Sequence, residues 1–217
     1  DDLSRGLGDV YKRQMELRAK LESKGVKFRT KRSDTEVVLN GLKEMGDDFV
    51  YELRGQFAIA FFDLEKRNLT LFRDRLGQKP NFYYQNKEKI IFGSNLLSIK
   101  EKSNESKISE ESLREYLETG VVQSPNTIYE KIYKLKPAEI INISFKKNEI
   151  KKVSKTYWKP EDFIDEKTFK DDEFFNLFSE SVNLRTQADV EVANFLSGGI
   201  DSSSITVSYT HLTLPTK

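Results

Sequence analysis

The sequence contains no cysteine and only one histidine, His211, and both shortages exclude kinds of chemistry. Without cysteine the chain can form no disulfide and no thiolate zinc site, and it has no thiol nucleophile of its own. Acid–base catalysis by histidine would depend on a single residue close to the carboxyl end.

Charge of one sign and long apolar runs are missing as well. Lys and Arg number 36 against 35 Asp and Glu, so the net charge is +1 and no basic field attracts nucleic acid. No apolar run approaches the length of about 18 residues that crosses a bilayer, and no signal-peptide pattern opens the chain. We therefore expect a cytoplasmic protein that binds neither nucleic acid nor a membrane.

Hydrophobic residues, at 37% of the chain and including 15 Phe, are numerous enough to build a sizeable core. The run QFAIAFFD at 56–63 is almost wholly apolar, as expected of a core strand that is covered on both faces. Buried strands with helices before and after them predict a layered α+β domain. We expect a helix at 15–24, a strand at 26–30, a helix at 34–46, more helical signal at 49–55, and strands at 56–63, 68–74, 81–85 and 89–94.

Ser33 and Glu36 have the spacing of a helix-capping box, S-x-x-E, at the start of the second of these helices. Further along, a capped helix is expected from Ser109 to Gly120, followed by strands around the Lys-Pro turn at 136–137. The charged segment 159–173 is the best linker candidate. After it we expect a helix with one apolar face, made by Phe174, Leu177, Phe178 and Val182, and then a strand at 188–196.

The two ends of the chain fit poorly with the segments beside them. The stretch after Ile205 should continue a helix, yet TVSYTHLTLPTK is rich in β-branched residues and contains a proline. The first 14 residues show no clear apolar period. We therefore expect Asp1–Gln14 and roughly Ser208–Lys217 to be foreign sequence outside the fold.

The string SGGIDS at 197–202 has the composition of an anion site between a strand and a helix. Gly198 and Gly199 let the backbone approach an anion closely, and the hydroxyls of Ser197 and Ser202 add donors beside the helix amino terminus. Asp201 fits such a site if Mg²⁺ accompanies a phosphate chain. Neither the Walker A pattern nor the Rossmann fingerprint matches the string.

The string S-G-G-x-D-S resembles the PP-loop of enzymes that cleave ATP to AMP and pyrophosphate. Together with SDTEVVL at 33–39, LRGQFAIAFFD at 53–63, RDRLGQKPNFYY at 73–84 and TYW at 156–158, it makes the chain similar to glutamine-hydrolysing asparagine synthetases. The resemblance covers nearly all of residues 15–207, in the order that the family has.

The resemblance implies an α+β N-terminal-nucleophile (αββα) glutaminase domain at 15–159, truncated at its amino terminus. The start of an α/β PP-loop ATP pyrophosphatase domain would follow at 160–207. In the family, an N-terminal cysteine releases ammonia from glutamine, aspartate is activated as aspartyl-AMP, and ammonia displaces AMP. The implied substrates are glutamine, aspartate and ATP with Mg²⁺, and a homodimer is left open for the full-length parent.

Carried over one by one, the family's functional positions fall on few residues of this chain. Asp34 stands where the family binds the α-amino group of glutamine, and a carboxylate suits an ammonium group. The ATP-binding positions are Leu196, Ser197, Gly198, Gly199, Asp201 and Ser202, with Asp201 also toward the metal. The nucleophilic cysteine would lie upstream of Met15, so we expect an internal fragment that is inactive as it stands.

Other residues of the family's motifs have a structural interpretation. Arg73, Asp74 and Arg75 are expected to form a charged turn that ion pairs hold together, and Trp158 to be a packing anchor between domains. Asn81 stands where the family usually has Leu, and Ala138 where it has Gly. Such departures leave the identity of the acceptor open.

Two alternatives remain beside the asparagine synthetase. In the first, the same two-domain plan serves another acceptor, as in β-lactam synthetases or in amidotransferases that modify cell-surface polysaccharide or peptides. A cysteine upstream would favour an amidotransferase, and its absence a ring-closing synthetase that needs no ammonia. In the second, the glycine loop is a nucleotide or phosphate sensor, and the strand domain is a scaffold for protein interactions.

Overall fold

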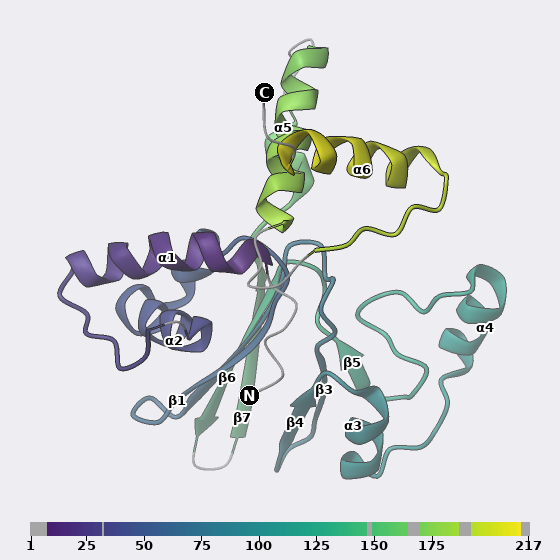
Figure 1. Ribbon diagram of the computed structural model, residues 1–217. Helices are drawn as coiled ribbons and strands as arrows, with labels where there is room; N and C mark the ends of the chain where they lie inside the picture. Colours follow the sequence, from purple (N-terminus) through teal and green to yellow (C-terminus); the bar gives the residue numbers. More distant parts are fainter. Residues whose placement is uncertain (1–7, 32, 147–148, 165–169, 187–191, 214–217) are drawn as a thin grey trace. The chain divides into compact units, whose positions relative to one another are not determined.

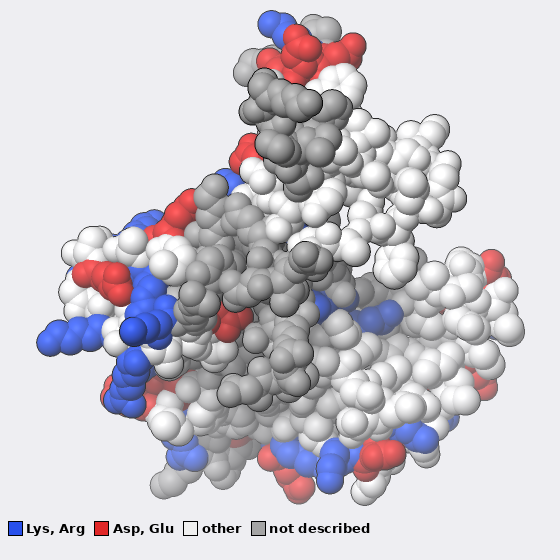
Figure 2. Space-filling model, viewed as in Figure 1, with Lys and Arg blue, Asp and Glu red and all other residues white. Residues whose placement is uncertain are grey.

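A computed structural model describes residues 8–31, 33–146, 149–164, 170–186 and 192–213 (Figure 1). The chain divides into two compact units. One combines Asp1–Gly55 with Asp165–Lys217, and the other is Gln56–Ile164. Within the described residues no helix is long and apolar enough to cross a membrane. Figure 2 shows Lys and Arg side chains interspersed with Asp and Glu on the face in view, as the nearly balanced composition leads one to expect.

Two antiparallel sheets build the unit Gln56–Ile164 and confirm the predicted α+β fold. The larger sheet has the strand order β1-β2-β6-β7 and the smaller one β4-β3-β5. Their strands are β1 (Ala58–Asp63), β2 (Asn68–Arg73), β3 (Phe82–Gln85), β4 (Ile90–Gly93), β5 (Ile132–Lys134), β6 (Glu139–Lys146) and β7 (Glu149–Thr156).

The core of this unit lies between the two sheets, because alternate residues of each strand point to the same face. On the larger sheet Leu69 pairs with Ile143, and Leu71 with Ile141. The smaller sheet contributes Tyr83, and Leu135 follows β5. These six buried side chains form one cluster, and burial of a single one stabilises the fold by about 1.5–3 kcal/mol.

The opposite face of the smaller sheet is covered by α3 (Leu96–Ser103). Ile99 of this helix packs with Tyr84 and Ile132 of the sheet. Asn95 caps the helix by accepting a hydrogen bond from the Ser98 amide at 3.1 Å. The sequence pattern did not reveal this helix, because it is short and few of its residues are buried. The unit is therefore layered as sheet, sheet and helix.

The predicted helix after Ser109 is confirmed as α4 (Glu110–Thr119). Ser109 is its N-cap, and its hydroxyl accepts from the Ser112 amide at 3.2 Å. Gly120 ends the helix at φ +75°, a conformation that favours glycine. Both ends match the prediction because capping involves residues within one helical turn.

The expectation that residues 56–63 are covered on both faces is wrong. Ala58, Ala60 and Phe62 are exposed, whereas Ile59 and Phe61 are half-buried. Among the described strands β1 pairs only with β2, so it lies at the edge of its sheet. An edge position explains why an apolar run, which the sequence assigns to the core, keeps one accessible face.

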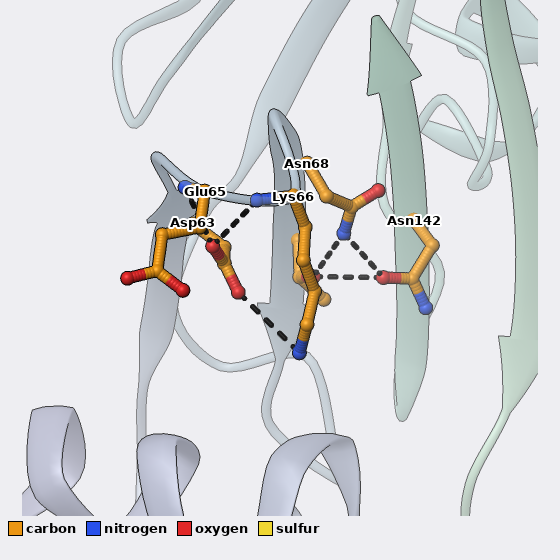
Figure 3. A network of polar contacts seen from close by, with 6 residues as sticks. Asp63, Glu65, Lys66, Asn68 and Asn142 are labelled. Carbon is orange, nitrogen blue, oxygen red and sulfur yellow. Dashed lines mark hydrogen bonds and ion pairs between the residues drawn. The ribbon is translucent and has the colours of Figure 1, made fainter.

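A polar network crosses from β2 to β6 on the face of the larger sheet that Phe72 and Ile140 share (Figure 3). Thr70 Oγ1 donates to Asn142 Oδ1 at 2.7 Å, and Asn68 Nδ2 donates to the same oxygen at 3.2 Å. In the turn before β2, Asp63 Oδ1 accepts from the backbone amides of Glu65 and Lys66. The bond from Lys66 lowers the pKa of the Asp63 carboxyl. These bonds give partners to side-chain and turn groups that do not take part in the hydrogen bonds between strands.

Arg73 and Asp74 hold the loop that follows β2, and both bond chiefly to the backbone. The Arg73 guanidinium donates to the carbonyls of Lys79 at 2.9 Å, Gly77 at 2.5 Å, and Leu135. The Asp74 carboxylate accepts from the amides of residues 76, 78 and 79 at 2.9–3.2 Å. The structural interpretation of these charges fits, and hydrogen bonds from Arg73 and to Asp74 hold the loop through its backbone. Burial lowers the pKa of Arg73, and the charges of Asp74 and Glu139 act in the opposite direction.

Two departures from the family pattern lie beside this loop. Ala138 has φ +54°, a left-handed conformation that glycine adopts without strain, which gives a physical reason for Gly at this position. Its amide still donates to the Asp74 carbonyl at 2.9 Å. Asn81 is buried, and its side chain donates to the Phe72 carbonyl at 3.3 Å, so its polar group is paired.

Trp158 is half-buried and stacks on Phe163, with 5.8 Å between the ring centroids. Phe163 belongs to the short helix η2 (Pro160–Phe163) of the same unit. A role of Trp158 between domains stays a prediction. The neighbouring Tyr157 hydroxyl donates to the Arg73 carbonyl at 3.0 Å and ties β7 to the loop after β2.

The other unit begins with α1 (Gly8–Ser23), α2 (Asp34–Met45) and the 3-10 helix η1 (Gly46–Glu52). Helix α1 starts seven residues before the predicted Met15. Gly46 ends α2 as predicted, and its amide donates a hydrogen bond to the Leu42 carbonyl. The strand predicted at 26–30 is wrong, because this segment forms no strand and two of its amides donate to Glu36 instead.

Helices α5 (Asp171–Arg185) and α6 (Ile200–Thr213) complete this unit. In α5 only Val182 of the predicted apolar face is buried, at 8% exposure, while Phe174 and Leu177 are exposed. Helix α6 continues past Ile205 to Thr213, and the interpretation of roughly Ser208–Lys217 as foreign sequence stays a prediction. The predicted strand at 188–196 falls partly outside the described residues, and its described part, 192–196, has no regular structure.

Replacing Asp74 with Asn tests whether the charge-to-backbone bonds hold the β2 loop. The amide keeps the shape of the side chain but leaves one oxygen for three N–H donors at a site that is 1% exposed. We expect the free energy of unfolding to fall by about 2–4 kcal/mol, because bonds to a buried charge are strong. Urea unfolding followed by fluorescence of Trp158, the only tryptophan, measures the change.

Glu88→Gln is the matched control, because it neutralises an exposed carboxylate of the same unit. We expect it to change the free energy of unfolding by less than about 0.5 kcal/mol. Equal urea midpoints for Asp74→Asn and Glu88→Gln would show that the buried charge does not hold the loop.

Candidate glutamine and nucleotide sites

Asp34, the residue predicted to bind the α-amino group of glutamine, is the first residue of α2. Its side chain is partly buried, and Oδ1 accepts from the Thr35 amide at 2.6 Å and from the Thr35 hydroxyl at 3.2 Å. No hydrogen bond to Oδ2 is present within the described part of the chain. One carboxylate oxygen therefore stays available to a cation at the start of the helix.

Ser33 caps this helix and sets the place of Asp34. Its hydroxyl accepts from the Glu36 amide at 3.2 Å, as the S-x-x-E spacing predicts. The second half of a capping box would send the Glu36 carboxylate back to the amide of Ser33. The structure differs here, because that carboxylate accepts from the amides of Arg29 at 2.6 Å and Thr30 at 2.8 Å, and from the Thr30 hydroxyl.

These bonds lower the pKa of Glu36 from 4.5 to about 2, with the Arg29 amide as the largest cause. The positive charge of Arg18 acts in the same direction. Arg18 lies 4.3 Å from the ring centroid of Phe28 and pairs with Glu22 at 3.0 Å. The hydrogen bonds and the charge around Glu36 thus favour its ionised form. The sequence pattern predicts Glu36 only as part of the cap and does not reveal this role.

The string SGGIDS begins as an exposed loop at residues 197–199, and its last three residues are the first three of α6. Gly198 has φ +82°, and a Cβ at this position would meet no atom within 4 Å, so the space beside the loop is open. Ser197 Oγ and Ser202 Oγ lie 3.0 Å apart, and Ser202 Oγ also donates to the Gly199 carbonyl at 3.1 Å. The structure therefore brings both predicted hydroxyls together at the amino terminus of a helix, where backbone amides favour an anion.

Asn194 links the segment before the loop to α6 by hydrogen bonds. It is not among the residues predicted from the sequence. Its Nδ2 donates to Thr206 Oγ1 at 2.7 Å and to the Ser202 carbonyl at 3.4 Å. The Tyr209 hydroxyl donates to the Val192 carbonyl at 3.1 Å. An Asn three residues before S-G-G is too common a signal to have identified this contact. Beside these bonds Leu196 is exposed, and Phe195 is 97% exposed.

Asp201 is exposed at the second position of α6. In the part of the chain that the structure describes, no three His, Asp or Glu side chains come together as metal ligands. A single carboxylate fits Mg²⁺ that takes most of its ligands from phosphate and water. Within the same ranges no hydrogen bond or ion pair joins Asp34 to the loop.

Comparison with known proteins finds two families along the chain. The family model of the glutamine amidotransferase domain matches residues 7–158, and that of asparagine synthase matches residues 173–216. Both Asp34 and the motif R-D-R-L-G-Q-K-P lie in the first match, and the glycine loop lies in the second.

Several curated relatives are named as glutamine-hydrolysing asparagine synthetases. A Methanocaldococcus jannaschii protein, provisionally named asparagine synthetase [glutamine-hydrolyzing] 2, is 35% identical over 80% of this chain and 34% of its own. Asparagine synthetases [glutamine-hydrolyzing] 1 and 3 of Bacillus subtilis are 33% and 36% identical over 91% and 92% of this chain. These matches take in 31% and 32% of the two B. subtilis proteins, so the chain spans about a third of the length of its relatives.

A solved structure of glutamine phosphoribosylpyrophosphate amidotransferase from B. subtilis matches 64% of this chain and 26% of its own. The TM-score is 0.42 and the identity 18%, which is too low to establish a common fold.

The lowered pKa of Glu36 predicts a specific titration. Because the folded-state pKa lies below the usual 4.5, the stabilising contribution of the carboxylate is complete above pH 4.5 and is lost as the pH falls toward 2. We expect the amide resonances of Arg29 and Thr30 to titrate with a midpoint of about 2 in NMR spectra. Glu36→Gln should remove this step, and a midpoint near 4.5 would contradict the bonds described here.

Proposed function

The chain belongs to the glutamine amidotransferase domain family and continues into a segment of asparagine synthase, and from this premise we propose that it is part of an ATP-dependent, glutamine-hydrolysing asparagine synthetase. The observation that carries the proposal is that one chain holds a carboxylate with an available oxygen at a helix start and an open glycine loop, each within the matching family. The proposed division near residue 159 agrees with the interval between the two family matches.

Glutamine would bind through its α-ammonium group at Asp34. The free oxygen of its carboxylate can accept a charge-assisted hydrogen bond from that group. The thiol that attacks the amide of glutamine is not among this chain's residues, because the sequence has no cysteine.

ATP would bind with its phosphates at the glycine loop. Gly198 and Gly199 leave room for the phosphate oxygens, and the hydroxyls of Ser197 and Ser202 would turn from each other and from the Gly199 carbonyl to donate to them. In the proposed reaction the side-chain carboxylate of aspartate attacks the α-phosphorus of ATP, forming aspartyl-AMP and releasing pyrophosphate. Ammonia then attacks the acyl carbon, loses a proton, and releases AMP to give asparagine. The loop's task is to stabilise the negative charge that grows on the leaving pyrophosphate.

Mg²⁺ would bind the phosphate chain and neutralise part of its charge, and Asp201 would be its ligand from the protein. The exposed position of Asp201 supports a metal that arrives with the nucleotide rather than one held by a ready-made protein site. Aspartate as the acceptor rests on the names of the relatives. The residues described here bear on glutamine and on the nucleotide.

Ser202→Ala tests the nucleotide site in the full chain. The substitution removes a hydroxyl at the loop, and we expect the affinity for Mg²⁺-ATP to fall by about tenfold, or about 1.4 kcal/mol, as for one lost hydrogen bond to a charged group. Isothermal titration calorimetry measures the affinity. Ser204→Ala is the control, because Ser204 is exposed on the same helix, and should leave the affinity unchanged within about twofold. Equal affinities of the two variants would exclude Ser202 from the site.

The chain by itself should release no ammonia from glutamine, because it contains no cysteine to attack the amide. The measurement couples ammonia to an NADPH-dependent glutamate dehydrogenase, with added ammonium chloride as a positive control. Release of ammonia above the background without protein would show that another nucleophile in this chain acts on glutamine.

A further inference from the structure

Residues 26–30 reach α2 without strand pairing, and the side chain of Glu36 is what holds the end of this segment. Its Oε1 accepts from the Arg29 amide, and its Oε2 accepts from the amide and hydroxyl of Thr30. We propose that Glu36 is a positioning residue for the glutamine site, because it fixes the backbone before α2 and so sets where the Asp34 carboxylate lies. The inference deepens the proposed function and rests on it for the identity of the ligand.

Glu36 links the two ends of the segment 30–36, which contains Asp34. Thr30 lies at one end of the segment and Glu36 at the other, and the Glu36 amide donates to Ser33 Oγ from the same residue. Glu36 therefore contacts the chain on both sides of the position where α2 begins. Loss of its carboxylate would free residues 29 and 30 and leave the start of the helix held by Ser33 alone.

The same bonds decide which carboxylate can bind a ligand. Both oxygens of Glu36 already accept hydrogen bonds from N–H or O–H groups, and each such bond favours a fixed orientation. Asp34, two residues away, uses only Oδ1 within the described residues, for the two groups of Thr35. Asp34 Oδ2, which accepts no hydrogen bond within the described residues, is thus the carboxylate oxygen with the most room for an ammonium group at this helix start.

The positive charge of Arg18 supports this arrangement from α1. Its guanidinium lies over Phe28, the residue before Arg29, and its charge favours the ionised form of Glu36. Phe28, Arg29 and Thr30 are therefore held from two helices. A carboxylate that is displaced by even a small distance loses much of its contribution to binding, because a charge-assisted hydrogen bond needs good geometry.

The test compares Glu36→Ala and Glu36→Gln with the control Glu44→Ala in the full chain. Glu44 is an exposed acid near the end of the same helix. Two NMR readouts address the mechanism. Amide hydrogen exchange at Arg29 and Thr30 reports whether these amides stay hydrogen-bonded to residue 36. Three-bond couplings of the Asp34 side chain report whether it keeps one rotamer. Glu36→Gln, which keeps the shape and one acceptor oxygen, guards against a variant that fails to fold.

We expect Glu36→Ala to speed exchange at Arg29 and Thr30 by at least about tenfold and to average the Asp34 couplings, while Glu44→Ala changes neither. Glu36→Gln should fall between them. If exchange rises and the Asp34 couplings stay those of one rotamer, Glu36 holds only the loop and the proposal is wrong. Unchanged exchange in Glu36→Ala would overturn it as well.

Titration of the chain with L-glutamine, followed by the amide resonances of residues 34–36, separates this inference from the proposed function. Glutaramate, which lacks the α-amino group, is the matched ligand control. We expect shifts with L-glutamine alone, and about tenfold weaker binding in Glu36→Ala than in Glu44→Ala. Absence of shifts in the unchanged chain would contradict the proposed glutamine site, while the exchange and coupling data would still decide whether Glu36 positions Asp34.

Discussion

Backbone N–H and C=O groups that no helix or sheet pairs must find other partners, and this requirement shapes the parts of the molecule that matter most. Three charged side chains meet it at two such places. Arg73 donates to three carbonyls and Asp74 accepts from three amides after β2, while Glu36 accepts from two amides before α2. A full charge is a strong partner for a backbone dipole, so few residues suffice to fix a loop without regular structure.

The two sheets depend on the loop after β2, because it joins elements that are distant in sequence. Arg73 bonds to the carbonyl of Leu135, beside β5, and the Tyr157 hydroxyl bonds to the carbonyl of Arg73. Strands β2, β5 and β7 therefore meet at one buried charged residue. Burial of the hydrophobic cluster is the larger stabilising contribution, whereas this polar junction links segments that are distant in the sequence.

The candidate sites use helix starts in two different ways. At α2 the carboxylate of Asp34 keeps one available oxygen, whereas the carboxylate of Glu36 accepts from backbone amides. The available oxygen can accept a hydrogen bond from a cation. At α6 the helix follows two glycines and carries hydroxyls, so the site suits an anion. One chain thus presents chemistry for an amino group and for phosphate. An enzyme that moves nitrogen from glutamine at the expense of ATP needs both.

The sequence by itself determined the features that depend on neighbours within one helical turn or one strand. These include the caps at Ser33 and Ser109, the helix ends at Gly46 and Gly120, the alternating strands around Leu69 and Ile141, and the motifs that indicate the family. Tertiary structure decided the rest: the absence of a strand at 26–30, the exposed face of β1, helix α3, and the backbone partners of Arg73 and Glu36. The reason is physical. Propensity and periodicity describe local preference, whereas the partner of a charge or of a strand edge is the group that folding brings close, such as Leu135 for Arg73 across 62 positions.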